Sequence, residues 1–581
     1  MDLPIPEREF DFVVIGGGTA GLAVASRLTE DSAVHVVVLE AGQAHLGDPK
    51  ISRPEQVTQT FGDPQYDWLF KTEKQPFSGD NEYTWSRGKG LGGSSAMNYF
   101  CWTKPPAADV DAIEKLGNPG WNWDEYMKYS MRSETFHPPA TDDPDAPGLS
   151  FEPKFRGKDG PIHSSIAFPY NDIDELTQQT LVNKGLRRLK DPYGGDITGV
   201  STASSNVNPS DYTRSYAATG YFESARDRPN LVVLTEAMVS RVLFSEKTGE
   251  EGKTATSVEY IHEGRTCLVH IRAQGEVILS AGAIQSPKIL ELSGIGRPEV
   301  LAAIGVDMKI QLDGVGENVQ EHTSMDVSFE LARSFPSTAK PPSGPGITAF
   351  AYLPLTAATS NASALIDLAV EQVQTRCLGS LAPGLKEQLD LQLDALRDDT
   401  TPDFEVVAFP GFKSPVSTPD PAKRYFTMVT VLNHPFSRGT IHAKSADPLD
   451  HPSIDPRYFE NDFDLELHVQ HIKYIRGLAA TEPMKSAIVR EVDPGPEYIS
   501  DEDIREYIKK YHWTTWHTIG SCSMLPKEKN GVVDPELKVY GTTNLRVVDL
   551  SVIPLHIAAH TQTTVYMIAE KAVDIIRGNR T

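Results

Sequence analysis

The alternation of apolar and polar residues predicts a chain of mixed strands and helices. Residues 10–16, FDFVVIG, form a short apolar run rich in β-branched residues, which is typical of a buried strand. Good helix formers follow over residues 20–28, and HVVVLEAG predicts a second buried strand that ends at Glu40. The same reasoning predicts two short strands within 228–244, a strand over EVILSAG, a long amphipathic helix over DFDLELHVQHIKYIRGLAA, and a helical tail over HTQTTVYMIAEKAVDIIRG.

Local signals predict where other elements begin and end. Asn122 is expected to cap a helix, with Glu125 three residues later. In SPKILELSGIG, Ser286 is expected to be the N-cap, with Pro287 at the first helical position and Gly294 past the end. Two further stretches predict strands: RGTIHAKSADPLDHPSIDPRYF alternates like a strand and hairpin, and LRVVDLSVIP reads as an apolar strand interrupted by an aspartate.

A glycine pattern joins the first strand to the first helix. Gly16, Gly18 and Gly21 give GxGxxG: the first permits the turn, the second lets a pyrophosphate approach, and the third lets helix and strand pack closely. The helix N-terminus offers N–H groups to the phosphates. Glu40, at the end of the second strand, can accept ribose hydroxyls. Together these features predict a dinucleotide site, and the fingerprint alone leaves FAD and NAD open.

Dinucleotide-binding elements occur at the N-terminus, near residues 230–320 and at the C-terminus, and segments of different composition lie between them. This indicates a discontinuous cofactor domain with a second domain woven through it. We expect the cofactor domain to comprise residues 1–50, 84–105, 226–322 and 525–581, and the substrate domain residues 51–83, 106–225 and 323–524. Residues 323–420, rich in Pro, Ser, Ala and Asp, are expected to include a lid or variable insertion.

Composition excludes several classes of partner. The net charge of −24 argues against nucleic acid or an anionic membrane as a main partner, because phosphate binding needs a basic surface. Four cysteines without a CxxC pair disfavour a zinc ribbon or a disulfide framework. MDLPIPEREFDF lacks the apolar core of a signal peptide, and no apolar run is long enough to span a bilayer. We therefore expect a cytoplasmic protein, with a trimmed leader as the open alternative.

Two stretches carry residue types suited to chemistry. Residues 87–102, RGKGLGGSSAMNYFCW, hold four glycines and two serines within nine residues; they could approach a flat or anionic ligand, or form an ordinary loop. Residues 511–524, YHWTTWHTIGSCSM, could be a metal site, a nucleophile with its base, a flavin-facing acid/base or packed core. The absence of a second histidine or acid at ligand spacing argues against a metal. The residues in question are His512, Trp513, Trp516, His517 and Cys522.

Six segments, taken together, resemble the glucose–methanol–choline (GMC) oxidoreductase family of flavoproteins. They are GxGxxG with LEAG, GKGLGGSSAMN, GAIQSPKILELSGIG, GVGENVQEH, WHTIGSCSM and DLSVIP with HTQTTVYMIAEKAVDII. The resemblance covers nearly the whole chain and is sharpest to fungal aryl-alcohol oxidase and formate oxidase types in GVVDPELKVYGTTNLRVVDLSVIP. It implies an α/β fold, α+β overall, with a Rossmann-like FAD-binding domain and a substrate domain built on an antiparallel sheet. It also implies FAD rather than NAD as the tightly held cofactor.

The resemblance assigns cofactor-binding residues. The glycine cradle would hold the pyrophosphate, Glu40 the adenosine ribose and Val239 the adenine, while later residues surround the flavin side. Met97 stands where some members carry a histidine bonded to the flavin, so the resemblance implies noncovalent FAD. The residues carried over are Gly16, Gly18, Thr19, Ala20, Gly21, Glu40, Ala41, Arg87, Leu91, Ser94, Ser95, Asn98, Val239, Asp549, Gln562 and Thr563.

The resemblance also implies two catalytic histidines. His517 would take the hydroxyl proton while a hydride leaves the carbinol carbon for flavin N5, and an ordinary pKa near 6.5 suits a histidine to that task. His560 would align the alkoxide or donate a hydrogen bond. Formate oxidase carries an arginine, suited to a carboxylate, where this chain has His560. This difference weakens the hypothesis that the substrate is formate and favours a primary alcohol, aryl or allylic.

Aromatic residues are expected to shape the access to this site. Tyr99, Phe100 and Trp102 could form an aromatic wall, with Trp516 lining the pocket. His512 and Cys522 are expected to be structural.

Several functional alternatives stay open at this stage. O₂ would be reduced to H₂O₂ by an oxidase, whereas a dehydrogenase would pass electrons to a quinone-type acceptor. A lyase or cyclase of a natural-product pathway would use FAD structurally, and a noncatalytic FAD-binding scaffold is the third rival. The oligomeric state is left open.

Overall fold

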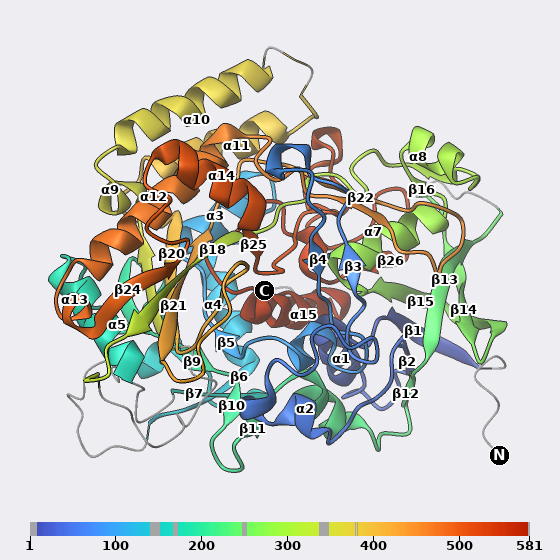
Figure 1. The fold of residues 1–581 in the computed structure, drawn as a ribbon. Helices are drawn as coiled ribbons and strands as arrows, with labels where there is room; N and C mark the ends of the chain where they lie inside the picture. Colours follow the sequence, from blue (N-terminus) through green and yellow to red (C-terminus); the bar gives the residue numbers. More distant parts are fainter. Residues whose placement is uncertain are drawn as a thin grey trace.

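Two large sheets organise the chain (Figure 1), as described by a computed structural model over residues 8–139, 151–166, 172–246, 252–335, 348–377, 379 and 381–578. In the view of Figure 1 the first sheet lies to the right and the second to the left, with the C-terminal helix α15 between their labels. Each sheet has seven strands within this part of the chain. None of its helices is long and apolar enough to cross a membrane.

The first sheet has a parallel core with an antiparallel extension. Its order is β12-β2-β1-β15-β14-β13, with β26 beside β15. Parallel pairs join β12 to β2, β2 to β1, β1 to β15 and β15 to β26, whereas β13, β14 and β15 pair antiparallel. The strands are β1 (Glu9–Ile15), β2 (Val36–Leu39), β12 (Leu231–Leu234), β13 (Ala237–Phe244), β14 (Ala255–His262), β15 (Arg265–Leu279) and β26 (Leu545–Val547).

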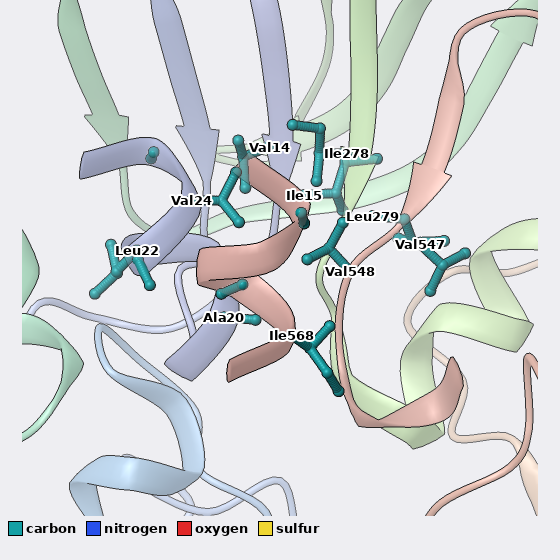
Figure 2. Packing of buried hydrophobic residues seen from close by; sticks show 14 of the residues in the cluster. Val14, Ile15, Ala20, Leu22, Val24, Ile278, Leu279, Val547, Val548 and Ile568 are labelled. Atoms are coloured by element: carbon teal, nitrogen blue, oxygen red, sulfur yellow. The ribbon is translucent and has the colours of Figure 1, made fainter. Parts of the chain in front are cut away.

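Two helices bury one face of this parallel core. Helix α1 (Thr19–Leu28) directly follows β1, and it packs against α15 (Gln562–Ile576). Figure 2 shows apolar side chains of both helices meeting those of β1, β15 and the end of β26. All four residues of β2 are buried, as expected for a parallel strand covered on both faces. The predicted Rossmann-like domain is thus confirmed, together with its first strand, helix and second strand.

Helix α7 (Gly282–Leu292) differs from the sequence prediction. It begins before the expected N-cap Ser286, so Pro287 lies inside the helix rather than at its first position. A proline has no N–H to donate to the carbonyl four residues earlier, here that of Ala283. The hydroxyl of Ser521 donates to this carbonyl at 2.6 Å instead. The predicted start was wrong because the compensating group lies far away in sequence, whereas the predicted end, with Gly294 just past it, is confirmed.

The strand predicted over LRVVDLSVIP is shorter than expected. Strand β26 ends at Val547, and a 3₁₀ turn covers Leu550–Val552. Between them, the Asp549 carboxylate accepts the N–H groups of Ser551 and Gly282 and the hydroxyl of Ser286. Three donors on one carboxylate fix a turn where the apolar pattern suggested a continuous strand.

The second sheet is antiparallel, as predicted. Its order is β24-β18-β21-β20-β19-β8, with β25 beside β18. Residues 323–420, expected to hold a lid or insertion, supply three of its strands as well as helices α10 (Ala362–Cys377) and α11 (Leu385–Leu396); 336–347, 378 and 380 lie outside the described residues. The strands are β8 (Gly199–Thr202), β18 (Thr323–Leu331), β19 (Ala349–Leu353), β20 (Phe404–Phe409), β21 (Tyr425–Leu432), β24 (Ile488–Asp493) and β25 (Trp513–Thr514).

Several smaller sequence predictions are confirmed. The long amphipathic segment forms α12 (Asp462–Ala479), which packs against β18 and β21. Strands β22 (Thr440–His442) and β23 (Ser453–Asp455) pair as the expected hairpin. Asn122 caps α4 (Trp123–Arg132) by accepting the N–H of Glu125. The domain boundaries stay a prediction.

Candidate active site

A cavity of about 550 Å³ is lined by residues of both sheets and of the loops between them. It takes in residues from the first glycine turn to the start of α15. Most of the predicted cofactor-binding residues line it, together with Met97. They are Gly16, Gly18, Thr19, Ala20, Glu40, Ala41, Arg87, Ser94, Ser95, Asn98, Val239, Asp549 and Gln562.

Three predicted cofactor-binding residues do not line this cavity. A Cβ on Gly21 would lie 1.9 Å from the carbonyl oxygen of Gly16, so this glycine serves helix–strand packing, as expected of the third glycine. Leu91 is buried in the core against Gly17. Thr563 is fully buried, and its hydroxyl donates to the carbonyl of Thr103. Leu91 and Thr563 therefore pack behind the residues that line the cavity.

Backbone crowding explains the glycines at one end of the cavity. Gly16 has a φ of +101°, which L-residues with a side chain rarely adopt. A Cβ on Gly93 would lie 2.9 Å from the Cα of Gly18, so the two glycine-rich loops touch through bare backbone. The loop of residues 87–102 thus closes over the first turn, and only glycine fits at this contact.

Glu40 lies at the end of β2, where the sequence placed it. Its carboxylate accepts the backbone N–H groups of Gly17 at 2.8 Å, Gly42 at 2.8 Å and Gly90 at 3.1 Å. Burial raises the pKa of Glu40, although these three bonds oppose the rise. The side chain is therefore held rigidly between both glycine loops.

The polar groups of the cavity fit FAD. Asn98 donates to the Gln562 side-chain oxygen, which leaves Gln562 Nε2 as a buried donor without a partner among the described residues. Gln285 Oε1 is likewise a buried acceptor without one. Both residues line the cavity, where a flat ligand with donors and acceptors could satisfy them. With the glycine cradle and Glu40, they form a donor and acceptor set suited to a dinucleotide with a polar ring.

His517 follows β25 and reaches the cavity in the neutral form. Its Nδ1 lies 2.9 Å from the hydroxyl of Thr515 and 3.0 Å from Nδ1 of His322. Its backbone N–H donates to Glu321, which also accepts the hydroxyl of Thr518. Burial, assisted by neighbouring cations, lowers the pKa of His517 well below its usual value. A neutral imidazole can accept a proton.

His560 lies opposite, in a different electrostatic environment. Its Nε2 is 2.8 Å from Oε1 of Glu405, a side chain on β20 that is 1% exposed. Burial alone lowers the pKa of His560, but Cys101 and Glu405 outweigh it and raise the pKa well above the usual value. The rings of His517 and His560 have centroids 4.9 Å apart and an interplanar angle of 76°. One cavity therefore holds a neutral and a cationic histidine.

Sequence reasoning missed Glu405 and Phe61. Glu405 lies in FEVVAF, within the region read as a lid or insertion; an acid inside a buried strand was the available signal. Phe61 had no motif. Its ring stacks between Tyr99 (5.3 Å, 26°) and Trp516 (5.1 Å, 25°), and all three residues line the cavity.

Two members of the expected aromatic wall lie elsewhere. Phe100 is fully buried, with the guanidinium of Arg214 3.5 Å above its ring. Trp102 is also fully buried, and its indole N–H donates to Glu134. Neither is among the cavity-lining residues, whereas Tyr99 and Cys101, their neighbours in the sequence, are. The wall contains Tyr99 and Trp516 but not Phe100 or Trp102.

The two residues of the histidine–tryptophan stretch expected to be structural lie outside the cavity lining. His512 Nδ1 is 3.0 Å from the hydroxyl of Tyr83, and its ring packs among Tyr458 and Phe459. Cys522 is fully buried in the first core. Among the described residues no cluster of three potential metal ligands occurs.

Comparison with known proteins identifies the family. The family model described as GMC oxidoreductase matches residues 10–324 in its N-terminal part and 435–569 in its C-terminal part. The GMC oxidoreductase family protein Mala s 12 of Malassezia sympodialis is 33% identical over 98% of this chain and 93% of its own length. The chain belongs to the GMC oxidoreductase family, whose members bind FAD, and it is an oxidoreductase.

Solved structures agree with this assignment. An FAD-dependent oxidoreductase from Chaetomium thermophilum superposes with a TM-score of 0.88 at 26% identity, over 98% of this chain and 99% of its own. A fungal aryl-alcohol oxidase gives 0.85 at 28% identity, again over 98% and 99%. Formate oxidase is also among the similar structures. The resemblance seen in the sequence is therefore confirmed.

Proposed function

We propose that the protein oxidises a primary alcohol, aryl or allylic, to the aldehyde with noncovalently bound FAD. The observation that carries this proposal is the pair of histidines on one cavity: burial lowers the pKa of His517 and keeps it neutral, whereas Cys101 and Glu405 raise the pKa of His560 and keep it cationic. Opposite shifts in two adjacent titratable groups are the usual mark of a base and its acidic partner.

The two side chains have separate tasks in this proposal. His517 takes the proton of the substrate hydroxyl, because burial keeps it unprotonated. His560 stabilises the negative charge that develops on the substrate oxygen, because it is cationic and lies 4.9 Å from His517, centroid to centroid. When bound, FAD would supply the acceptor for the hydride of the carbinol carbon.

The cavity wall supports an aromatic or allylic substrate. Phe61, Tyr99 and Trp516 form a continuous stack on the cavity, and a flat substrate can stack on it. Val407 and Phe409 of β20 add apolar surface. We propose O₂ as the electron acceptor, reduced to H₂O₂.

A panel of primary alcohols with purified protein tests the reaction. Benzyl and cinnamyl alcohols should bleach the flavin without air and yield peroxide with air, and cyclohexylmethanol should be poorer because it cannot stack. Bleaching of the flavin without peroxide formation would indicate that the electron acceptor is of the quinone type rather than O₂. A protein whose flavin no alcohol bleaches would be a lyase, cyclase or scaffold, against the proposal.

The base is tested by His517→Ala. This variant should lose turnover by about 10²- to 10⁴-fold while the protein stays yellow, because the base is lost and the cofactor cradle is intact. His270→Ala, an exposed histidine of β15, is the control and should keep wild-type turnover. Wild-type turnover in His517→Ala would overturn the assignment.

A further inference from the structure

Two fully buried histidines stand behind His517 without lining the cavity. His322 precedes β18; its Nδ1 lies 3.0 Å from Nδ1 of His517, and its Nε2 lies 2.9 Å from the backbone carbonyl oxygen of Asn433. His556 stacks on His322 with ring centroids 3.5 Å apart. The reaction proposed above uses neither ring, so their arrangement needs its own explanation.

The hydrogen bonds of His322 determine where its proton lies. A carbonyl oxygen only accepts, so His322 Nε2 must carry the hydrogen that it donates to Asn433. Burial lowers the pKa of His322 well below its usual value, so the ring is neutral and has a single N–H. Its Nδ1 is therefore a bare acceptor.

The tautomer of His322 determines which ring nitrogen of His517 carries the hydrogen. Two bare nitrogens 3.0 Å apart would repel, so His517 Nδ1 must carry a hydrogen and donate it to His322. The Thr515 hydroxyl oxygen lies 2.9 Å from His517 Nδ1 and can accept this hydrogen as well. The hydroxyl can then direct its own hydrogen at the carbonyl oxygen of His322, 3.5 Å away. A neutral His517 then has its lone pair on Nε2.

His556 fixes the positions of both rings. The N–H of Ile557 donates to His556 Nδ1 at 3.0 Å, so His556 Nε2 carries the hydrogen and donates to the carbonyl of His517 at 3.0 Å. The stack then holds the plane of His322. Charged groups act on the pair from other elements: Arg87 and His560 on His517, and His434 and His560 on His322, while Glu321 binds the backbone of His517.

We propose that His322 is a positioning residue that holds His517 in the tautomer with a bare Nε2, the form able to take the substrate proton. The carbonyl of Asn433 sets the tautomer of His322, and His322 sets that of His517. This inference rests on the proposed function, because it assigns a task to His322 only if His517 is the base. The inference concerns the contact between the His322 and His517 rings and does not involve the residues that would hold the cofactor.

Substitution at His322 tests the proposal. His322→Leu removes the acceptor, so His517 can adopt the other tautomer and accept from Thr515; the rate constant of anaerobic flavin reduction should fall by about 10²-fold or more across pH 5–9, with little change in substrate affinity. His322→Gln can donate to Asn433 and accept from His517, so it should recover the rate to within about tenfold. His468→Leu is the control: it removes another fully buried histidine, bonded to Thr323, and should leave the rate unchanged.

A second measurement does not depend on these variants folding. In imidazole-¹⁵N NMR spectra of the wild-type holoenzyme, the signals lost in His517→Ala should be those of a ring protonated at Nδ1 and bare at Nε2. The opposite tautomer would overturn the proposal, and so would a His322→Leu protein with wild-type reduction rate and pH profile. Either result leaves the His517→Ala test unaffected, whereas an active His517→Ala protein would remove the proposed function itself.

Discussion

Glu405 is one of the two groups, with Cys101, that raise the pKa of His560 and so set the charge in the cavity. Glu405 Oε1 lies 2.8 Å from His560 Nε2, and the carboxylate is 1% exposed, so solvent screens the pair little. The raised pKa of His560 means that its charge stabilises the fold below the unfolded pKa near 6.5, and that this contribution is lost as pH rises through the raised folded value. Activity that needs the cation should be lost over the same alkaline range.

Glu405→Gln keeps the shape of this side chain and removes its charge. The pKa of His560 should then fall, and the alkaline limb of the kcat/KM profile should move to lower pH, because the cation is lost earlier. Glu330→Gln is the matched control: Glu330 lies on β18 of the same sheet, with β21 between β18 and β20, and it pairs with Lys423 and Arg490. An alkaline limb unchanged in Glu405→Gln would show that the carboxylate does not hold the charge of His560.

At the scale of elements, α7 depends on a distant hydroxyl. Pro287 leaves the Ala283 carbonyl without its helical donor, and the buried Ser521 hydroxyl replaces it. Ser521→Ala should lower the free energy of unfolding by about 1–3 kcal/mol, because a buried acceptor loses its partner. In a Pro287→Ala background the helix supplies its own N–H, so the same substitution should cost clearly less.

A double-mutant cycle of thermal unfolding on FAD-loaded protein measures this difference. A cost of Ser521→Ala that is the same in both backgrounds would mean that the hydroxyl does not replace the missing N–H.

Elements with their pattern in contiguous residues could be predicted from the sequence. The apolar period of α12 and the hairpin of β22 and β23 follow from neighbouring residues alone. The start of α7 could not be predicted, because Ser521 supports it from 238 positions away. The end of β26 depends in the same way on two donors to Asp549 from the distant helix α7, Gly282 and Ser286.

The candidate site shows the same limit. The glycine cradle and Glu40 lie within one strand–helix–strand unit, so their spacing predicted their place. Glu405 meets His560 only because β20 pairs with β19 and β21 in the second sheet. His322 belonged to a recognised motif, GVGENVQEH, but its task depends on a carbonyl after β21 that no local pattern indicates.

At the scale of the whole molecule, a buried triad joins distant parts of the chain. His434, after β21, lies 3.1 Å from Asp403 and 3.1 Å from Asp109 of α3 (Ala107–Lys115). Asp109 also accepts the N–H of Ala558, two residues before His560. The triad thus fixes the second sheet, helix α3 and the segment that carries the cationic histidine to one another.

The charge of this triad predicts how the molecule responds to alkaline pH. Burial lowers the pKa of His434, but the two carboxylates outweigh it and raise the pKa to about 10. A raised folded pKa means that the stabilisation, on the order of a few kcal/mol, is complete below about pH 6.5 and disappears as pH rises towards 10. Wild-type protein should therefore lose thermal stability steadily between pH 7 and 10.

His434→Gln isolates the contribution of the triad. The variant should unfold at lower temperature than the wild type at pH 7, because two buried carboxylates lose their cation, and its midpoint should fall less between pH 7 and 10. Thermal unfolding followed by circular dichroism at several pH values measures both changes, with the exposed His270→Gln as control. Equal losses in wild type and His434→Gln over this range would assign the alkaline instability to other groups, because only a histidine charged in the folded state makes the two curves converge as pH approaches 10.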